Sequence, residues 1–249
     1  MGSKQSRRRS GWVVVTLCLL VAGVVGASMV FKEAPPPTPP PTLDEMIPPP
    51  IDTAAIRRNQ EAMRQIIQTH PDPVVRVWAD REIREFRLYT AFQKSVTGGA
   101  ANVAAFGIVE MGGRAVPVLM CDPDLVCSDA MSMVEKQLVV RHEIEHYRQY
   151  LAHRFPDETF EARPAGTQFT ETDVRCLVIA ESEAYMVEGE LAKRLKTHSN
   201  YNIVQAYIDG GYAKMMGELV AEYQHVPLVQ SQLHTLQSVA DSLVAAHRS

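Results

Sequence analysis

The chain has 249 residues, of which 46% are hydrophobic and 22% are charged, as in an ordinary globular protein. The formal net charge of -4 gives no basic surface, so nucleic acid is not an expected partner. The four cysteines are too few for a disulfide scaffold and lack the C-x-x-C pairs of a cysteine zinc site. Cys121 and Cys127 could form one bridge in an oxidising compartment or remain free thiols, and both alternatives stay open.

The N-terminus has the pattern of a membrane anchor. Residues 1–10 form a basic tail, and residues 11–31 contain no charged side chain. A helix of that length spans about 30 Å, the thickness of the hydrocarbon core. We predict a single-pass transmembrane signal anchor with the tail in the cytoplasm and the rest outside, on the periplasmic side of a bacterial inner membrane. A signal peptide cleaved after Ala27 is the alternative.

A proline-rich linker, residues 32–51, follows this segment. Runs of proline favour extended polyproline II structure, which serves as a semi-rigid spacer. From residue 52 to residue 249 the composition is globular. About 200 residues suffice for one domain with its own core.

Hydrophobic periodicity and helix-breaking residues predict a mostly helical domain. The expected helices cover residues 52–69, 72–94, 128–153, 172–196, 201–224 and 227–247. Two strand-like runs, residues 103–109 and 115–120, flank the hairpin signal Gly112-Gly113. Pro117 cannot donate a ladder hydrogen bond, so the second strand should lie at an edge. The predicted fold class is α+β, predominantly helical, with a small β-hairpin.

The most informative pattern is His142-Glu143-x-x-His146, on the helix expected over 128–153. Residues four apart lie on one face of a helix, so two such imidazoles can bind one zinc ion. The glutamate beside the first histidine can then reach a water molecule on that ion. Apolar residues at helical spacing lead directly into the motif: Met131, Val134 and Leu138. Histidines that continue a buried stripe need partners, and a metal ion is one.

Two histidines leave such a site short of a third protein ligand, and Glu181 is the main candidate. It lies in the middle of an apolar helix face formed by Val174, Leu177, Val178, Ala184, Tyr185 and Leu191. A carboxylate on a buried face should bind a metal ion or pair with a cation, for example Arg141. We predict Glu181 as the third ligand, with Glu183 as the reserve.

Together these residues resemble the zincin metallopeptidases of the gluzincin type. The resemblance rests on His142-Glu143-x-x-His146-x-x-Gln149 followed by Glu181-x-x-Ala184. It implies a zincin-like domain with a small sheet beside the active-site helix. It also implies Zn2+ held by His142, His146 and Glu181, with Glu143 as general base. The expected function is hydrolysis of peptide bonds in a peptide or protein substrate by a membrane-anchored zinc metallopeptidase.

The resemblance also shows what the site still needs. Several of these families have an aspartate directly after the alanine, where this chain has Tyr185, so the carboxylate behind a ligand histidine must come from elsewhere, such as Glu188. The run 115–120 is expected to be the edge strand along the cleft. The candidates to stabilise the developing oxyanion are Tyr185, Tyr212, Tyr223 and His225.

Two other classes of function remain open. The pair Glu143-x-x-His146 and Glu222-x-x-His225 is typical of ferritin-like di-iron bundles, which use two E-x-x-H motifs and two further glutamates. The third possibility is a non-catalytic, membrane-tethered binding domain. One zinc ion per chain would favour the peptidase, and two irons would favour the bundle.

Overall fold

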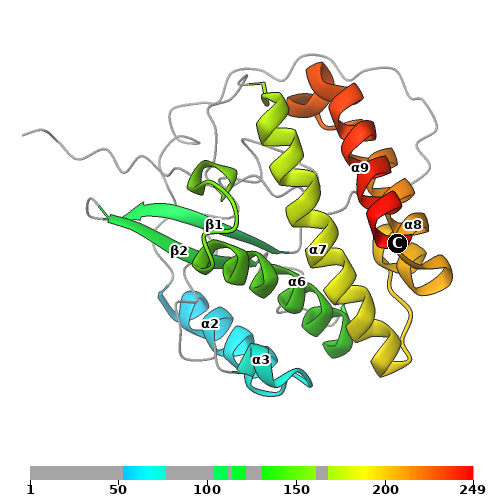
Figure 1. Cartoon of the computed structure of the whole chain (residues 1–249). Coiled ribbons are helices and arrows are strands. Elements are labelled where there is room, and N and C mark those ends of the chain that lie inside the picture. The colour runs from blue at the N-terminus through cyan, green and yellow to red at the C-terminus, as the bar shows by residue number, and fades with distance from the viewer. Residues whose placement is uncertain (1–52, 77–103, 112–113, 122–130, 161–167, 249) are drawn as a thin grey trace, which may run out of the picture.

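The computed structural model describes residues 53–76, 104–111, 114–121, 131–160 and 168–248. As predicted, this part of the chain is predominantly helical (Figure 1). Its helices are α2 (Thr53–Gln68), α3 (Pro73–Arg76), α6 (Met133–Leu151), α7 (Glu171–Leu195), α8 (Asn202–Tyr223) and α9 (Leu233–Arg248). Two short 3-10 helices are η1 (Asp157–Phe160) and η2 (Pro227–Gln232), and the strands are β1 (Ala104–Met111) and β2 (Arg114–Cys121).

The two strands form an antiparallel hairpin in the regions where strands were expected. Its register runs from Ala104 opposite Cys121 to Met111 opposite Arg114, with Pro117 opposite Ile108. Within the described residues this is a two-stranded sheet, so each strand has one unpaired edge. Both strands contact α6, and the Phe106 N–H of β1 donates to Glu143, while Leu119 of β2 packs against the opposite cluster of α6. The group nearest the motif therefore comes from β1, and the expectation that residues 115–120 form the edge along a cleft stays a prediction.

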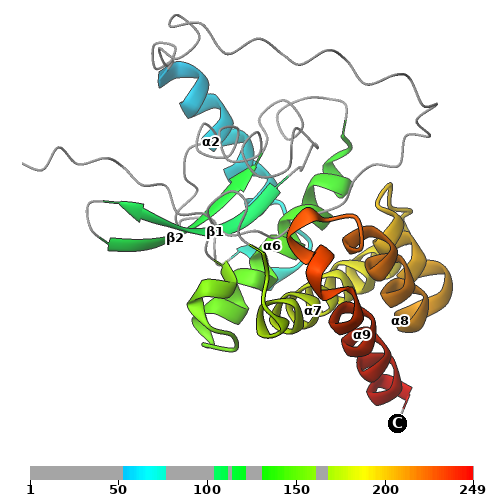
Figure 2. The same ribbon diagram turned by 90° about the horizontal axis from the view of Figure 1, so that it is seen from above.

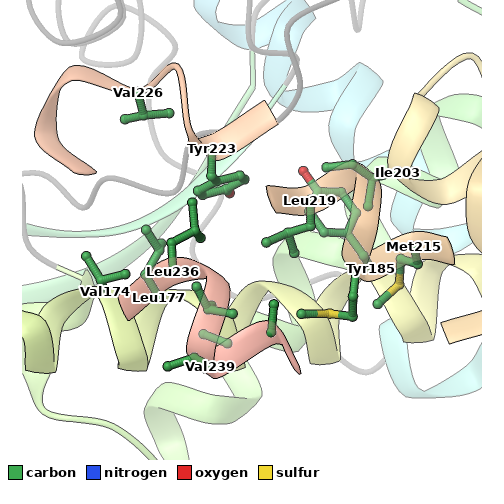
Figure 3. Close-up of a cluster of buried hydrophobic side chains, with 14 of the residues drawn as sticks. Val174, Leu177, Tyr185, Ile203, Met215, Leu219, Tyr223, Val226, Leu236 and Val239 are labelled. Atoms are coloured by element: carbon green, nitrogen blue, oxygen red, sulfur yellow. The ribbon is translucent and has the colours of Figure 1, made fainter. Parts of the chain in front are cut away.

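Helices α6 and α7 form the centre of the domain. Figures 1 and 2 show α2 and α3 on one side of α6, with α7, α8 and α9 on the other. The α2 side is closed by a small cluster of apolar side chains: Met63, Ile66, Ile67, Val139, Val140 and Ile144. The larger cluster joins α7, α8 and α9 and is drawn in Figure 3, where Leu177, Tyr223 and Leu236 lie near one another. The motif face of α6 is therefore directed toward α7.

Capping boxes fix where α6 and α7 begin. The Ser132 hydroxyl accepts from the Glu135 N–H at 3.2 Å, and the Glu135 carboxylate accepts from the Ser132 N–H at 2.9 Å. Thr170 and Asp173 make the same reciprocal pair at the start of α7. Each box satisfies two N–H groups that a helix start leaves without partners. The motif helix, expected from residue 128, therefore begins a few residues later, at Met133.

One further helix prediction needs correction, and another is tested only in part. Helix α3 begins at Pro73, as expected, and is described as far as Arg76, while the rest of the helix expected to reach residue 94 lies outside the described residues. The last helix starts at Leu233, after η2, and not at Pro227. Helix α8 is interrupted at Gly211, which has φ 74° and ψ -165° inside the helix. Only glycine adopts that conformation without strain. The possible Cys121–Cys127 bridge lies outside what the structure describes.

The membrane prediction is also corrected. Among the described residues, no helix is both long and apolar enough to cross a bilayer. Residues 11–31, from which the spanning helix was expected, lie outside those residues. The prediction of a single-pass membrane protein with a periplasmic domain is not borne out, because the described residues supply no spanning helix for it.

Candidate metal centre

The motif residues lie on the face of α6 that is turned away from solvent. The exposed fractions are 2% for His142, 1% for Glu143 and 0% for His146. One helical turn separates the two histidines, and their Nε2 atoms lie 3.0 Å apart. Two buried imidazoles this close to each other need a shared proton or a shared cation between their nitrogens.

Glu181 reaches the same point from α7. Its carboxylate oxygens lie 3.5 Å from Nε2 of His142 and 3.5 Å from Nε2 of His146. The residue is fully buried, and neither carboxylate oxygen has a hydrogen-bond partner that meets normal geometry. Desolvating a carboxylate in this way is costly unless a cation compensates for it. The predicted third ligand is thus in place, and the three residues form a buried group able to hold a metal ion.

The distances within this group fit a tetrahedral ion. Two ligand atoms about 2.0–2.1 Å from one zinc ion, at a tetrahedral angle, lie about 3.4 Å apart. The two Nε2 atoms lie 3.0 Å apart, and each lies 3.5 Å from a different oxygen of the Glu181 carboxylate. A small cation that takes nitrogen and oxygen ligands can therefore bind all three with little rearrangement.

The Nδ1 atom of each histidine, on the far side of the ring from the metal group, also contacts a polar side chain. Nδ1 of His142 lies 3.2 Å from the Glu188 carboxylate, and Nδ1 of His146 lies 2.9 Å from Oε1 of Gln149. Contacts of this kind orient ligand histidines in metal sites. Glu188 lies two turns beyond Glu181 on α7. It supplies the carboxylate behind His142 that an aspartate at the position of Tyr185 would supply in the resembling families. The second carboxylate oxygen of Glu188 is buried and has no hydrogen-bond partner.

Electrostatics favour a positive charge in this pocket. Burial alone would lower the pKa of His142, but the carboxylates of Glu181 and Glu188 raise this pKa well above its ordinary value. Burial lowers the pKa of His146 to about 4, so that imidazole is neutral. Two buried carboxylates therefore attract a cation to the space between the imidazoles, and a proton or a metal ion can supply that charge.

Glu143 lies beside the ligands and is bound to the hairpin. The Phe106 N–H donates to its Oε2 at 2.6 Å. Burial raises the pKa of Glu143 to about 7. This contact fixes the direction of the carboxylate of the predicted general base. The sequence carried no sign of it, because the donor is a backbone group 37 residues upstream.

The reserve ligand and the alternative partner of Glu181 both have other partners in the structure. Glu183, the reserve ligand, accepts hydrogen bonds from Gln149 and Arg154. Arg141, the alternative partner of Glu181, instead pairs with Asp72 at 3.2 Å and with Glu145 at 2.9 Å. Neither residue belongs to the three-residue group.

The second E-x-x-H pair, Glu222 and His225, does not join the site. His225 is exposed after the end of α8, beside Gln224. Among the described residues, the group of His142, His146 and Glu181 is the one arrangement that could hold a metal ion. The described residues therefore do not form the two-metal centre that a ferritin-like protein would need.

Two of the four oxyanion candidates lie near the metal group. The ring of Tyr185 is 4.4 Å from that of His142, and its buried hydroxyl has no hydrogen-bond partner. Burial and the nearby Glu181 carboxylate raise the pKa of Tyr223 well above its ordinary value, so its hydroxyl stays protonated and able to donate. Tyr212 stacks on His247 with ring centroids 4.3 Å apart, at the exposed end of α9.

The site is closed in this structure. The three candidate ligands, Glu143 and the two nearby tyrosines are all buried. Tyr223 belongs to the last turn of α8 and is close enough to Glu181 for that carboxylate to raise its pKa, so this end of α8 lies beside the group.

Comparison of the chain with protein-family models, with curated proteins and with solved structures found no match.

Proposed function

We propose that this protein is a zinc-dependent metallopeptidase with a gluzincin-like site. The observation that carries the proposal is the meeting of two Nε2 atoms and one carboxylate without hydrogen-bond partners, 3.0–3.5 Å apart in a buried pocket. Two histidines and a glutamate are the ligand set of a catalytic zinc site, which keeps a fourth position for water. The motif on α6 and the glutamate on α7 support this identity of the metal.

The residues around the group have separate tasks in this mechanism. His142, His146 and Glu181 would hold the ion, which when bound supplies a Lewis acid that lowers the pKa of water to about 7. Glu143 would accept a proton from water as the water oxygen adds to the peptide carbonyl carbon, and would deliver that proton to the amine nitrogen as the C–N bond breaks. The Phe106 N–H keeps one carboxylate oxygen of Glu143 fixed during these transfers.

A substitution of the general base tests the mechanism. Glu143→Gln should leave bound zinc unchanged and lower peptide hydrolysis about 10²–10⁴-fold, because it removes the proton acceptor but no ligand. Glu145→Gln is the matched control, since Glu145 is on the same helix and pairs with Arg141 and Arg148. The measurements are zinc per chain by elemental analysis and cleavage of a quenched fluorescent peptide library by the full chain. A full chain without zinc, or a Glu143→Gln variant as active as the parent, would refute the proposal.

Burial of the site favours one other function, a structural metal centre in a non-catalytic domain. Structural zinc sites are closed and usually have four protein ligands. The described residues supply three such ligands. A chain that binds one zinc ion, loses stability on chelation and cleaves no peptide, in either the parent or Glu143→Gln, would support that alternative.

A further inference from the structure

The two nitrogens of His146 lie in different surroundings. Nε2 faces Nε2 of His142 at 3.0 Å and the Glu181 carboxylate at 3.5 Å, while Nδ1 lies 2.9 Å from Oε1 of Gln149. A neutral imidazole carries a proton on one nitrogen only, and the other nitrogen offers a lone pair. A metal ligand needs that lone pair on the nitrogen that faces the ion.

The side-chain amide of Gln149 can lie in only one orientation. Its Nε2 is 3.1 Å from the carbonyl oxygen of Ala180 and 3.1 Å from Oε2 of Glu183. Both of these groups accept hydrogen bonds, so they require the amide NH2 and not the amide oxygen. The oxygen must then face His146, and His146 must donate to it from Nδ1.

The hydrogen bonds that run from His146 through Gln149 to Glu183 end at Arg154, at the protein surface. The Nε of Arg154 donates to both carboxylate oxygens of Glu183, at 3.1 and 3.0 Å. Gln149, Arg154 and Glu183 line an open hollow of about 560 Å³ near the C-terminal end of α6. Because Arg154 holds the carboxylate of Glu183 in place, the acceptor that orients Gln149 is fixed from outside the buried site.

We infer that Gln149 is a positioning residue of the metal site. Its amide is oriented by Ala180 and Glu183, and it fixes His146 as the Nδ1–H tautomer with the Nε2 lone pair toward the ion. The inference deepens the proposed function, on which it rests for the identity of the bound ion. The two histidines are then oriented by different means. His142 is backed by the buried charge of Glu188, and His146 by a neutral amide whose direction is set from the surface.

The substitution Gln149→Met tests this role, since methionine fills similar volume without the amide's hydrogen-bonding groups. In metal-free, 15N-labelled full chain, long-range 1H–15N correlation spectra should show the Nδ1–H tautomer of His146 in the parent. Gln149→Met should lose this tautomer preference and bind zinc about 10–100-fold more weakly in competition with a chromogenic chelator. Gln137→Met is the matched control, because Gln137 is a buried glutamine of the same helix whose amide bonds to Thr69. It should leave both the tautomer and the zinc affinity unchanged.

A paired exchange separates orientation from packing. Gln149→Glu alone places a carboxylate against the Ala180 carbonyl and the Glu183 carboxylate and should weaken zinc binding. Adding Glu183→Gln restores a donor beside that carboxylate and should recover most of the lost affinity. The inference is overturned if the parent shows the Nε2–H tautomer, if Gln149→Met keeps the parent's tautomer, or if the paired exchange recovers nothing. A parent that binds no zinc refutes the proposed function instead, while the tautomer spectra of the metal-free chains still decide the role of Gln149.

Discussion

Glu188 gives the sharpest test of how the metal site is built. Its Oε2 lies 3.2 Å from Nδ1 of His142, and both residues are buried. Glu188→Leu removes the acceptor, so His142 is no longer held in the orientation that directs Nε2 at the ion. Loss of such a contact typically lowers metal affinity about 10–100-fold. Glu188→Gln keeps an accepting oxygen and loses only the charge, so its effect should be smaller.

The size of the zinc-induced rise in Tm follows from the linkage between zinc binding and the free energy of unfolding. At a free zinc concentration 100 times the parent's Kd, zinc stabilises the parent by about 2.7 kcal/mol. At the same concentration, a variant that binds tenfold more weakly gains about 1.4 kcal/mol, and one that binds 100-fold more weakly gains about 0.4 kcal/mol. For a domain of about 200 residues, each kcal/mol corresponds to about 2–4 °C in Tm. The zinc-induced rise in Tm should therefore fall from about 5–11 °C to about 1–6 °C in Glu188→Leu.

The assay is thermal unfolding by circular dichroism, with and without buffered zinc. Glu190→Gln is the control, because that carboxylate is on the same helix but has 62% of its side-chain area exposed. It should keep the full zinc-induced rise. If Glu188→Leu also keeps the full rise, the contact with His142 does not support metal binding and the reasoning fails.

Three further predictions concern stability. Gly189→Ala places a Cβ 2.4 Å from the ring of Tyr207 and should lower the free energy of unfolding, measured in urea, by about 1–3 kcal/mol. Gly217→Ala adds a Cβ with no atom within 4 Å and should raise the free energy of unfolding by about 0.4–1 kcal/mol. Equal effects of the two substitutions would contradict the packing around Gly189. Ser132→Ala removes the cap of α6 and should cost about 0.5–2 kcal/mol in the same assay, unlike Ser132→Asp, which keeps an accepting oxygen. Burial lowers the pKa of His70 below its ordinary 6.5, so below that pH the unfolded chain binds a proton that the native state excludes. Stability should thus fall as the pH drops from 7 toward 5, and less steeply in His70→Asn; parallel slopes for the two proteins would show that His70 does not contribute.

The sequence by itself determined the helical character, the motif and the candidate for a third ligand. These depend on local spacing: residues four apart share a helix face, and a carboxylate in an apolar stripe implies a buried partner. The same local reasoning placed the start of α6 at residue 128, whereas the capping box of Ser132 and Glu135 begins the helix at Met133. It also expected a spanning helix that the described residues do not supply.

The sequence offered Glu188 as one possible partner, but only the tertiary structure decided what lies behind the candidate ligands. Glu188 reaches His142 across 46 positions of sequence, and Gln149 meets Ala180 across 31. Phe106 reaches Glu143 through a backbone N–H that any residue at that position would carry. Such contacts depend on how the faces of α6 and α7 and the strand β1 approach one another, which spacing along the chain does not encode. Their packing also closes the site, because the last turn of α8 places Tyr223 beside Glu181.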